Sequence, residues 1–351
     1  MAPELLAGTP RELGFRMPAE WEPHAGTLMS WPARRELWGQ RWEQGLDEYA
    51  GVARAVAAYE PVVMACLPGQ ADAVVDRCGS GVTPWEVVLD DSWARDNGPV
   101  LVTHPDGRVA VVSFRFNAWG ERWHPYDSDD RLPLEVADRL GLPVFEAPMV
   151  LEGGSFFVDG AGTVLVTEQC LLSPNRNPTM SRAQIEEALC DWLGASTVLW
   201  LPYGDSADVG PEGTDGHVDG VAQYLAPGRV LLSLPSDPAS SEYERSLANL
   251  AVLQSVPDAS GSLVEVVPLD GGPEATAWYA NHYLANGAVI VPVDGGPADE
   301  HVLAQLAAAY PDRDVVGVPG ATIQFGGGGP HCITQQIPAG VDLGGFSRDR
   351  S

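Results

Sequence analysis

The sequence predicts an α/β protein in which strands and helices alternate along the whole chain. Three observations support this prediction: apolar β-branched runs recur between turn residues, helix-like stretches separate them, and polar glycine-bearing segments return at a nearly constant interval. With 351 residues, of which 45% are hydrophobic and 19% are charged, the chain can bury a large core. We therefore expect a soluble globular protein.

Nine runs have the sequence pattern of strands. Each run is rich in apolar and β-branched residues, and each is bounded by Gly, Pro, Asp or Asn, which favour turns. In chain order the runs lie at 61–67, 85–91, 107–114, 162–168, 196–202, 229–235, 262–269, 287–293 and 313–320.

Five stretches between these runs have the pattern of helices. They lie at 40–60, 70–79, 181–194, 241–255 and 298–311. The stretch 181–194 shows the pattern most clearly, because apolar residues such as Leu189 and Leu193 fall on helical spacing. Ser181 can cap its start, and Gly194 stands where the helix should end.

Polar segments that contain glycine follow or separate the predicted strands at regular steps. From Asp90 to Glu152, His217, Asn281 and Cys332, the steps are 62, 65, 64 and 51 residues. A period of about 60 residues predicts about five supersecondary units whose loops meet at one centre. No low-complexity linker interrupts the chain, so we expect residues 1–351 to form a single catalytic domain.

Charge and composition exclude several classes of function. A net charge of −28 and a pI near 4.3 disfavour a nucleic-acid surface, which needs clustered cations, and favour small cationic ligands. All 20 residues of the Lys+Arg total are arginine. Without lysine, the chain can be neither a pyridoxal-phosphate enzyme nor a Walker A nucleotide-binding protein.

The cysteines and the length of the hydrophobic segments indicate the compartment of the protein. Five cysteines, an odd number, are widely spaced in a long chain without a secretory h-region, so we expect a cytoplasmic protein in a reducing compartment. No window approaches 18 uncharged apolar residues, so we expect no contact with a membrane through a spanning helix.

The stretch FGGGGPHCITQQ, residues 325–336, contains the most distinctive cysteine. A glycine run can expose a side chain and bring backbone N–H groups towards a ligand, so Cys332 is either a nucleophile or a buried structural thiol. Serine hydrolysis is disfavoured, since Ser155 lies outside any GxSxG motif. Zinc is disfavoured because no CxxC or HExxH pairing anchors two ligands; the possible ligands would be His217, Asp219, His331 and Cys332.

Other polar segments supply an imidazole, three carboxylates and an aromatic face. In an extended TDGHVDG segment, His217 and Asp219 would point to the same face. The segment SWARD adds Trp93 and Asp96, and EGGS adds Glu152. Carboxylates around a thiol fit a guanidinium, whose paired N–H donors match them and whose charge favours the thiolate. We therefore predict that a cysteine nucleophile attacks a guanidinium carbon.

These segments resemble the agmatine deiminases, within the larger group of peptidyl-arginine deiminase-like, guanidino-modifying enzymes. The resemblance extends from Arg16 to Pro338 and rests on MPAEWEPHAGTLMSWP, DDSWARDNGP, LEGGSFFVDGAGTVLVTEQCLLSPNRNP, TDGHVDG, ANGAVIVP and GGGGPHCITQQIP. It implies an α/β propeller, or pentein, with about five ββαβ units around a central active-site channel.

The resemblance also implies a reaction and its catalytic residues. Cys332 matches the nucleophile, which forms a covalent amidino intermediate, and His217 matches the general acid/base. Glu152 matches a carboxylate that contacts the substrate or orients the histidine. The implied reaction is the hydrolysis of agmatine to N-carbamoylputrescine and ammonia, a step of polyamine biosynthesis towards putrescine, and it needs no metal or organic cofactor.

Four further residues match substrate-binding positions of the family. Asp96 and Asp219 match carboxylates that grip the guanidinium, Trp93 would pack against the substrate, and Asn281 would supply a polar contact. The expected partner is thus a small cationic guanidino compound rather than a nucleic acid or a membrane. A homodimer is plausible from the same resemblance.

Three alternative functions stay open from the sequence. The same chemistry on free or peptidyl arginine would require an arginine near the α-carbon of the substrate, and the candidates are Arg115, Arg122 and Arg176. Amidino transfer to an acceptor amine would release no ammonia. A non-catalytic polyamine-binding protein on the same scaffold would bind agmatine without forming a product.

Overall fold

The computed structural model describes residues 3–210 and 213–347, and it confirms the predicted α/β class. In these residues the strands form five mixed sheets. The strand orders within the five sheets are β16–β1–β2–β3, β4–β5–β6, β7–β8–β9, β10–β11–β12 and β13–β14–β15. The bounds are β1 (His24–Ser30), β2 (Val62–Cys66), β3 (Val82–Glu86), β4 (Val100–Thr103), β5 (Val109–Arg115), β6 (Val144–Val150), β7 (Phe156–Val158), β8 (Thr163–Thr167), β9 (Thr197–Leu201), β10 (Ala222–Ala226), β11 (Arg229–Ser233), β12 (Glu265–Leu269), β13 (Tyr283–Ala285), β14 (Ala288–Val293), β15 (Asp314–Pro319) and β16 (Thr334–Pro338).

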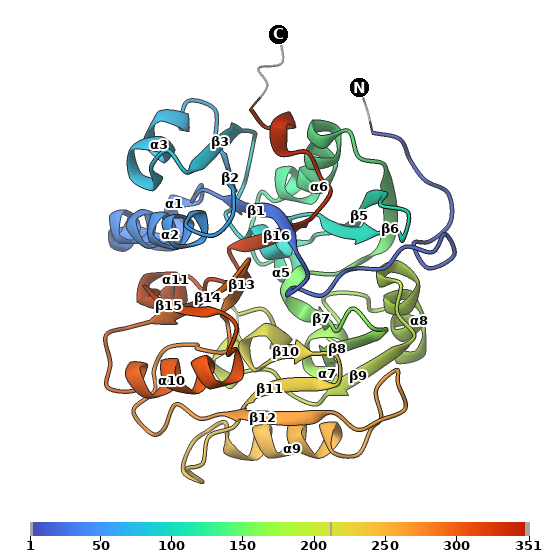
Figure 1. Cartoon of the computed structure of the whole chain (residues 1–351), viewed down its shortest axis with the longest axis vertical. Helices are drawn as coiled ribbons and strands as arrows, with labels where there is room; N and C mark the ends of the chain where they lie inside the picture. Colours follow the sequence, from blue (N-terminus) through green and yellow to red (C-terminus); the bar gives the residue numbers. More distant parts are fainter. Residues whose placement is uncertain (1–2, 211–212, 348–351) are drawn as a thin grey trace.

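The sheets share one scheme of strand pairing, to which the first sheet adds a fourth strand, β3, in parallel with β2. An antiparallel pair, such as β4 with β5, is followed by a parallel strand, such as β6, after a helical crossover. Figure 1 shows the sheets following one another around the molecule in chain order, with the long helices towards the outside. The crossover helices are α2 (Trp42–Ala57), α6 (Asp127–Leu140), α8 (Arg182–Leu193), α9 (Tyr243–Leu253) and α10 (Asp299–Ala309).

Shorter helical segments connect these elements. They are α1 (Arg35–Trp38), α3 (Ala71–Cys78), α4 (Ala94–Asn97), α5 (Ala118–Glu121), α7 (Glu168–Leu171), α11 (Ala321–Phe325), and the 3₁₀ segments η1 (Gly39–Arg41), η2 (Gly153–Ser155), η3 (Ser206–Asp208), η4 (Val218–Gly220) and η5 (Leu343–Gly345). In the described part of the chain, no helix combines the length and the apolar character that a bilayer crossing requires.

The predicted elements are largely present, with one wrong strand. All five predicted helices form, and eight of the nine predicted strands overlap an observed strand over most of their length. The prediction at 85–91 was wrong, because β3 ends at Glu86 and the chain then turns towards α4. The sequence did not predict α6, which contains Pro133 and an acidic first turn, or the strands β1, β4, β6, β7, β10, β13 and β16.

Local signals explain why α8 begins and ends where it does. The side chain of Ser181 accepts a hydrogen bond from the backbone of Gln184, whose side chain in turn bonds the backbone of Ser181, and this is a capping box. Gly194 ends the helix with φ +68°, and a Cβ there would lie 2.2 Å from the carbonyl oxygen of Phe15. Only glycine fits this position.

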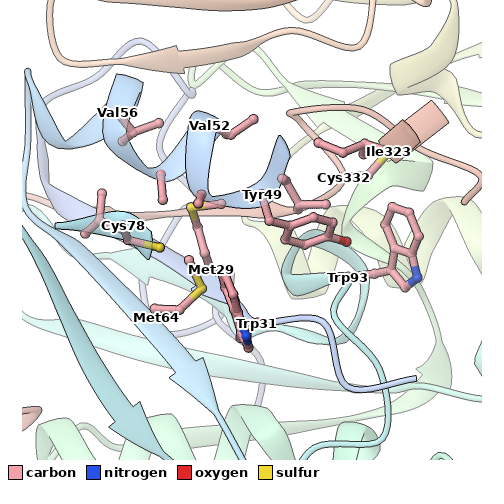
Figure 2. Close-up of a cluster of buried hydrophobic side chains, with 14 of the residues drawn as sticks. Met29, Trp31, Tyr49, Val52, Val56, Met64, Cys78, Trp93, Ile323 and Cys332 are labelled. Carbon is pink, nitrogen blue, oxygen red and sulfur yellow. The ribbon is translucent and has the colours of Figure 1, made fainter. Parts of the chain in front are cut away.

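The first sheet joins two segments that are far apart in the sequence. β1 pairs antiparallel with β16, so that Met29 lies opposite Thr334, and β1 also pairs in parallel with β2. Helix α2 packs beside this sheet in a large buried cluster that Figure 2 shows in part. Tyr49, Trp93 and Cys332 lie at one end of the cluster in this view, so the core extends up to the candidate nucleophile.

Candidate active site

Five successive connections between sheets carry the candidate residues. The chain passes from the last strand of one sheet to the first strand of the next at β3–β4, β6–β7, β9–β10, β12–β13 and β15–β16. These connections carry, in order, Trp93 with Asp96, Glu152, His217 with Asp219, Asn281, and Cys332. The regular steps in the sequence therefore correspond to one connection per sheet.

The thiol of Cys332 lies among polar groups from two other connections. Its Sγ is 3.1 Å from Nδ2 of Asn281 and 3.5 Å from Oδ2 of Asp219, and the side chain is buried. Burial, followed by the negative charges of Asp219 and Asp96, raises the pKa of this thiol well above its usual value. In the free protein Cys332 is therefore a neutral thiol, and a cation bound beside it would favour the thiolate.

His217 lies between two carboxylates. Its Nδ1 is 3.8 Å from Oδ1 of Asp96, and its Nε2 is 3.8 Å from Oε2 of Glu152. Neither ring nitrogen has a hydrogen-bond partner among the described residues, and the side chain is buried. Burial alone would lower the pKa of His217, but Asp96 and further neighbours raise it well above its usual value, which makes His217 a proton donor at neutral pH.

The backbone around His217 differs from the prediction. The extended TDGHVDG segment was wrong, because Val218–Gly220 form the 3₁₀ segment η4. His217 still reaches the site from the residue before η4, and Asp219 reaches it from within η4.

Two hydrogen bonds hold the carboxylate of Asp96. The backbone N–H of Gly154 donates to Oδ1 at 2.9 Å, and Nε1 of Trp119 donates to Oδ2 at 2.9 Å. Burial, only partly offset by His217, and the nearby charges of Asp219 and Glu152 raise the pKa of Asp96 to about 6. Asp96 therefore ionises close to neutral pH.

Glu152 is held by an arginine that the sequence did not identify as part of the catalytic group. Nε of Arg176 donates to Oε1 of Glu152 at 2.6 Å, and neither side chain is exposed. Arg176 also bonds Asp215 at 3.0 Å, and Arg122 bonds Asp215 from the other side at 2.6 Å. Burial would raise the pKa of Glu152, but Arg176 and then His217 lower it to about 2, so Glu152 stays charged.

Asp219 contacts a second histidine. Nδ1 of His331 lies 2.8 Å from Oδ2 of Asp219, the same oxygen that faces Cys332. Burial would raise the pKa of Asp219, but His331 lowers it below its usual range. His331 thus holds Asp219, a substrate-binding candidate, rather than a zinc ion. The glycine-rich segment that contains His331 did not reveal this role in the sequence.

A small cavity lies beside the sulfur. It has a volume of about 20 Å³ and is lined by Trp93, Trp119, Trp123, Asp96 and Cys332, among others. A neighbouring cavity of about 500 Å³ shares part of its lining, including Trp123 and Gly326. Because 20 Å³ admits about one water molecule, a guanidinium requires the aromatic walls to move apart.

One group of described residues has the geometry to hold a metal ion. The ligand atoms of Glu152, Cys170 and His217 lie within 4.8 Å of one another, and all three side chains are buried. The guanidinium of Arg176 already bonds Glu152, and its charge would repel a divalent cation. The zinc set considered from the sequence does not occur, since His331 contacts Asp219 and Glu20 instead.

The three arginines considered for a substrate carboxylate are all paired with acidic residues. Arg176 bonds Glu152 and Asp215, Arg122 bonds Asp215, and Arg115 lies on the surface beside Asp130. None of the three lines either cavity within the described residues.

Comparisons with known proteins give one consistent result. A sequence model of the family described as Porphyromonas-type peptidyl-arginine deiminase matches residues 16–338. The agmatine deiminase of Pseudomonas aeruginosa is 39% identical over 364 aligned positions, which cover 94% of this chain and 97% of that protein. The solved agmatine deiminase of Enterococcus faecalis has a TM-score of 0.91 and 34% identity, covering 97% of this chain and 100% of that one. A substrate-bound C. jejuni agmatine deiminase, at 22% identity and a TM-score of 0.83 over 93% of this chain, is similar in fold alone.

Proposed function

The chain belongs to the Porphyromonas-type peptidyl-arginine deiminase family, and we propose that it hydrolyses agmatine to N-carbamoylputrescine and ammonia. Relatives named agmatine deiminase match it along most of both chains, at 39% identity in P. aeruginosa and 34% in E. faecalis. One observation carries the proposal: Sγ of Cys332 lies 3.5 Å from the Asp219 carboxylate, at the wall of a cavity that Asp96 also lines. Two carboxylates beside a thiol suit a guanidinium.

The chemistry follows from the charges of these groups. Asp96 and Asp219 bind the guanidinium nitrogens, and the bound cation favours ionisation of Cys332, whose proton passes to a neighbouring base or to water. The thiolate attacks the guanidinium carbon, His217 protonates the departing ammonia, and a covalent amidino-cysteine remains. His217 then takes a proton from water, which attacks the same carbon and releases the ureido product with the thiol.

The other candidate residues have supporting roles in this proposal. Glu152 holds the His217 imidazole in its charged form, and its 3.8 Å approach supports this role. Asn281 donates from Nδ2 to the sulfur and stabilises the thiolate, and its polar contact with the substrate stays a prediction. Trp93 supplies an aromatic wall for the guanidinium or the alkyl chain.

The cavities favour agmatine over arginine. No arginine, lysine or histidine lines either cavity in the described residues, so nothing there offers a positive charge to an α-carboxylate. The larger cavity is instead lined in part by Glu36, whose exposed carboxylate suits a substrate with a second positive charge.

We extend the proposal to the architecture and the setting of the enzyme. Five ββαβ sheets in chain order support an α/β propeller with the site in its central channel, formed by residues 1–351 as one domain. The five cysteines are free thiols, which supports a reducing, cytoplasmic location. A homodimer stays a prediction.

The experiment is ammonia release from agmatine and, separately, from free arginine, with mass spectrometry of the acid-quenched intact protein. We expect turnover of agmatine and an amidino adduct that maps to Cys332. Turnover of arginine alone would overturn the substrate assignment, and agmatine binding without ammonia or an adduct would overturn the enzymatic assignment.

A further inference from the structure

A buried chain of ionisable groups leads away from the nucleophile. Oδ2 of Asp219 lies 3.5 Å from Sγ of Cys332 and 2.8 Å from Nδ1 of His331. Nε2 of His331 lies 2.9 Å from Oε2 of Glu20. Each of these side chains is less than 10% exposed, so solvent does not screen the charges along the chain.

Both nitrogens of the His331 ring face carboxylate oxygens. An ionised carboxylate only accepts hydrogen bonds, so satisfying Asp219 and Glu20 together requires a proton on each ring nitrogen. His331 is therefore an imidazolium between two carboxylates. The pKa of His331 moves in the same direction: burial and Arg95 oppose the charge, but Glu20 and Asp219 raise the pKa above its usual value.

Glu20 is fixed in this position by the scaffold. Its Oε1 accepts a hydrogen bond from the backbone of Leu284 at 2.9 Å, and Nη2 of Arg95 lies 3.4 Å from its Oε2. Phe157 packs on the His331 ring with 4.9 Å between the ring centroids. Positive and negative charges therefore alternate from Arg95 through Glu20 and His331 to Asp219.

A further histidine near His331, His282, does not disturb this order. Burial lowers the pKa of the nearby His282 to about 4, so His282 is neutral near pH 7. The groups that set the charge of His331 are thus Asp219, Glu20 and Arg95.

We propose that Glu20 and His331 are positioning residues for the reaction: Glu20 keeps His331 positively charged, and the His331 imidazolium balances the charge of Asp219 so that the adjacent Cys332 can ionise. An isolated Asp219 carboxylate 3.5 Å from the sulfur would oppose the thiolate. The imidazolium on the far side of the same oxygen offsets that repulsion and also fixes the orientation of the carboxylate towards a guanidinium. Without Glu20, His331 becomes neutral, keeps one proton for Asp219, and no longer offsets its charge.

The test compares two substitutions that separate charge from shape. Glu20→Gln keeps the length of the side chain and an acceptor for the backbone N–H of Leu284, but it removes the charge and places an amide NH2 in place of the oxygen that faces His331. Glu20→Asp keeps the charge and shortens the side chain. The rate of Cys332 alkylation by iodoacetamide is followed from pH 6 to 10, with peptide mass spectrometry to assign the modified cysteine. Because iodoacetamide needs no substrate recognition, the result is independent of whether agmatine is the substrate.

We expect Glu20→Gln to slow alkylation of Cys332 by about tenfold at each pH below the pKa of the thiol, which corresponds to a rise of roughly one unit in that pKa. Glu20→Asp should stay closer to the unchanged protein, and kcat for agmatine should fall more than KM rises in Glu20→Gln. The matched control is Glu22→Gln, which removes the partner of Arg16 near the surface and should not alter the alkylation profile.

Two outcomes would overturn the inference. An alkylation profile of folded Glu20→Gln that superimposes on that of the unchanged protein would exclude a role of the charge. A larger defect in Glu20→Asp than in Glu20→Gln would show that Glu20 acts by shape alone. Circular dichroism and thermal unfolding establish that each variant is folded before it is compared.

Discussion

Nε of Arg176 lies 2.6 Å from Oε1 of Glu152, and neither side chain has any exposure to solvent. The pair holds a charged carboxylate beneath His217, whose Nε2 is 3.8 Å from the other oxygen of Glu152. A buried ion pair of this kind contributes little net stability as a pair, but removal of one partner leaves a charge without compensation. The site therefore depends on Arg176 although Arg176 lines neither cavity.

Replacement of this arginine should destabilise the fold strongly. Arg176→Met should lower the free energy of unfolding at pH 7 by about 3–5 kcal/mol, because Glu152 keeps its burial and loses its cation. Urea denaturation measures this change. The matched control is Arg182→Met, which removes an exposed pair with Glu168 and should cost about 1 kcal/mol or less. Equal losses in the two variants would contradict the argument.

This loss should depend on pH. The pKa of Glu152 is lowered in the folded protein, so its contribution to stability is present above about pH 4.5 and is lost as pH falls through about 2. In Arg176→Met the carboxyl takes up a proton more readily, so the difference from the unchanged protein should shrink between pH 7 and pH 4. Denaturation at both pH values would measure it, and a constant difference would contradict the prediction.

Loss of the thiol should abolish turnover. Cys332→Ser should lower kcat by at least about 10⁴-fold, because serine in this acidic setting does not ionise. Agmatine should still bind, since Asp96 and Asp219 are unchanged, and isothermal titration would measure this binding. The control is Cys190→Ser on helix α8, which should retain full activity. Substantial ammonia release from Cys332→Ser would exclude the covalent mechanism.

The fall of kcat/KM at acid pH should follow the protonation of Asp96. Its pKa is about 6 in the free protein, so kcat/KM for agmatine should fall as pH drops below about 6, when the carboxyl becomes neutral and binds the guanidinium less well. Trp119→Phe removes the donor to Oδ2 and should move this fall to higher pH by roughly one unit. A fall that stays at the same pH in Trp119→Phe would contradict the assignment.

A methyl group at Gly154 should block the site. A Cβ at this position would lie 2.6 Å from Nδ1 of His217 and 2.8 Å from Oδ2 of Asp219. Gly154→Ala should therefore lower kcat/KM by about 10²-fold or more, because the reacting groups are displaced. The control is Gly220→Ala in the adjacent connection, where the nearest atom would be 3.8 Å away and activity should be retained.

The sequence predicted those parts of the fold that have strong local patterns. Central strands such as β8 and β14 are continuous apolar runs because both of their neighbours are strands, and α8 has caps at both ends. Two of the strands that were missed, β7 and β13, are only three residues long and adjoin polar connections of the candidate site. Helix α6 was missed because Pro133 and an acidic first turn obscure its apolar face.

The sequence predicted which residue types make up the candidate site, but it did not predict most of the contacts between them. Cys332, His217 and the carboxylates carry chemistry that is visible in single segments, and the structure brings them together. The contacts of Arg176 with Glu152 and of Glu20 with His331 join segments 24 and 311 residues apart. No periodicity encodes such a contact, because it depends on how the sheets are arranged in space.

The pairing of β1 with β16 has a consequence for synthesis of the protein. Residues 24–30 leave the ribosome early but find their antiparallel partner only after residues 334–338 have been made. Cys332 lies just before that partner strand, so the edge of the first sheet and the nucleophile arrive together. A nascent chain that stalls before this point lacks the thiol of Cys332 and has an unpaired strand edge that invites chaperone binding or aggregation.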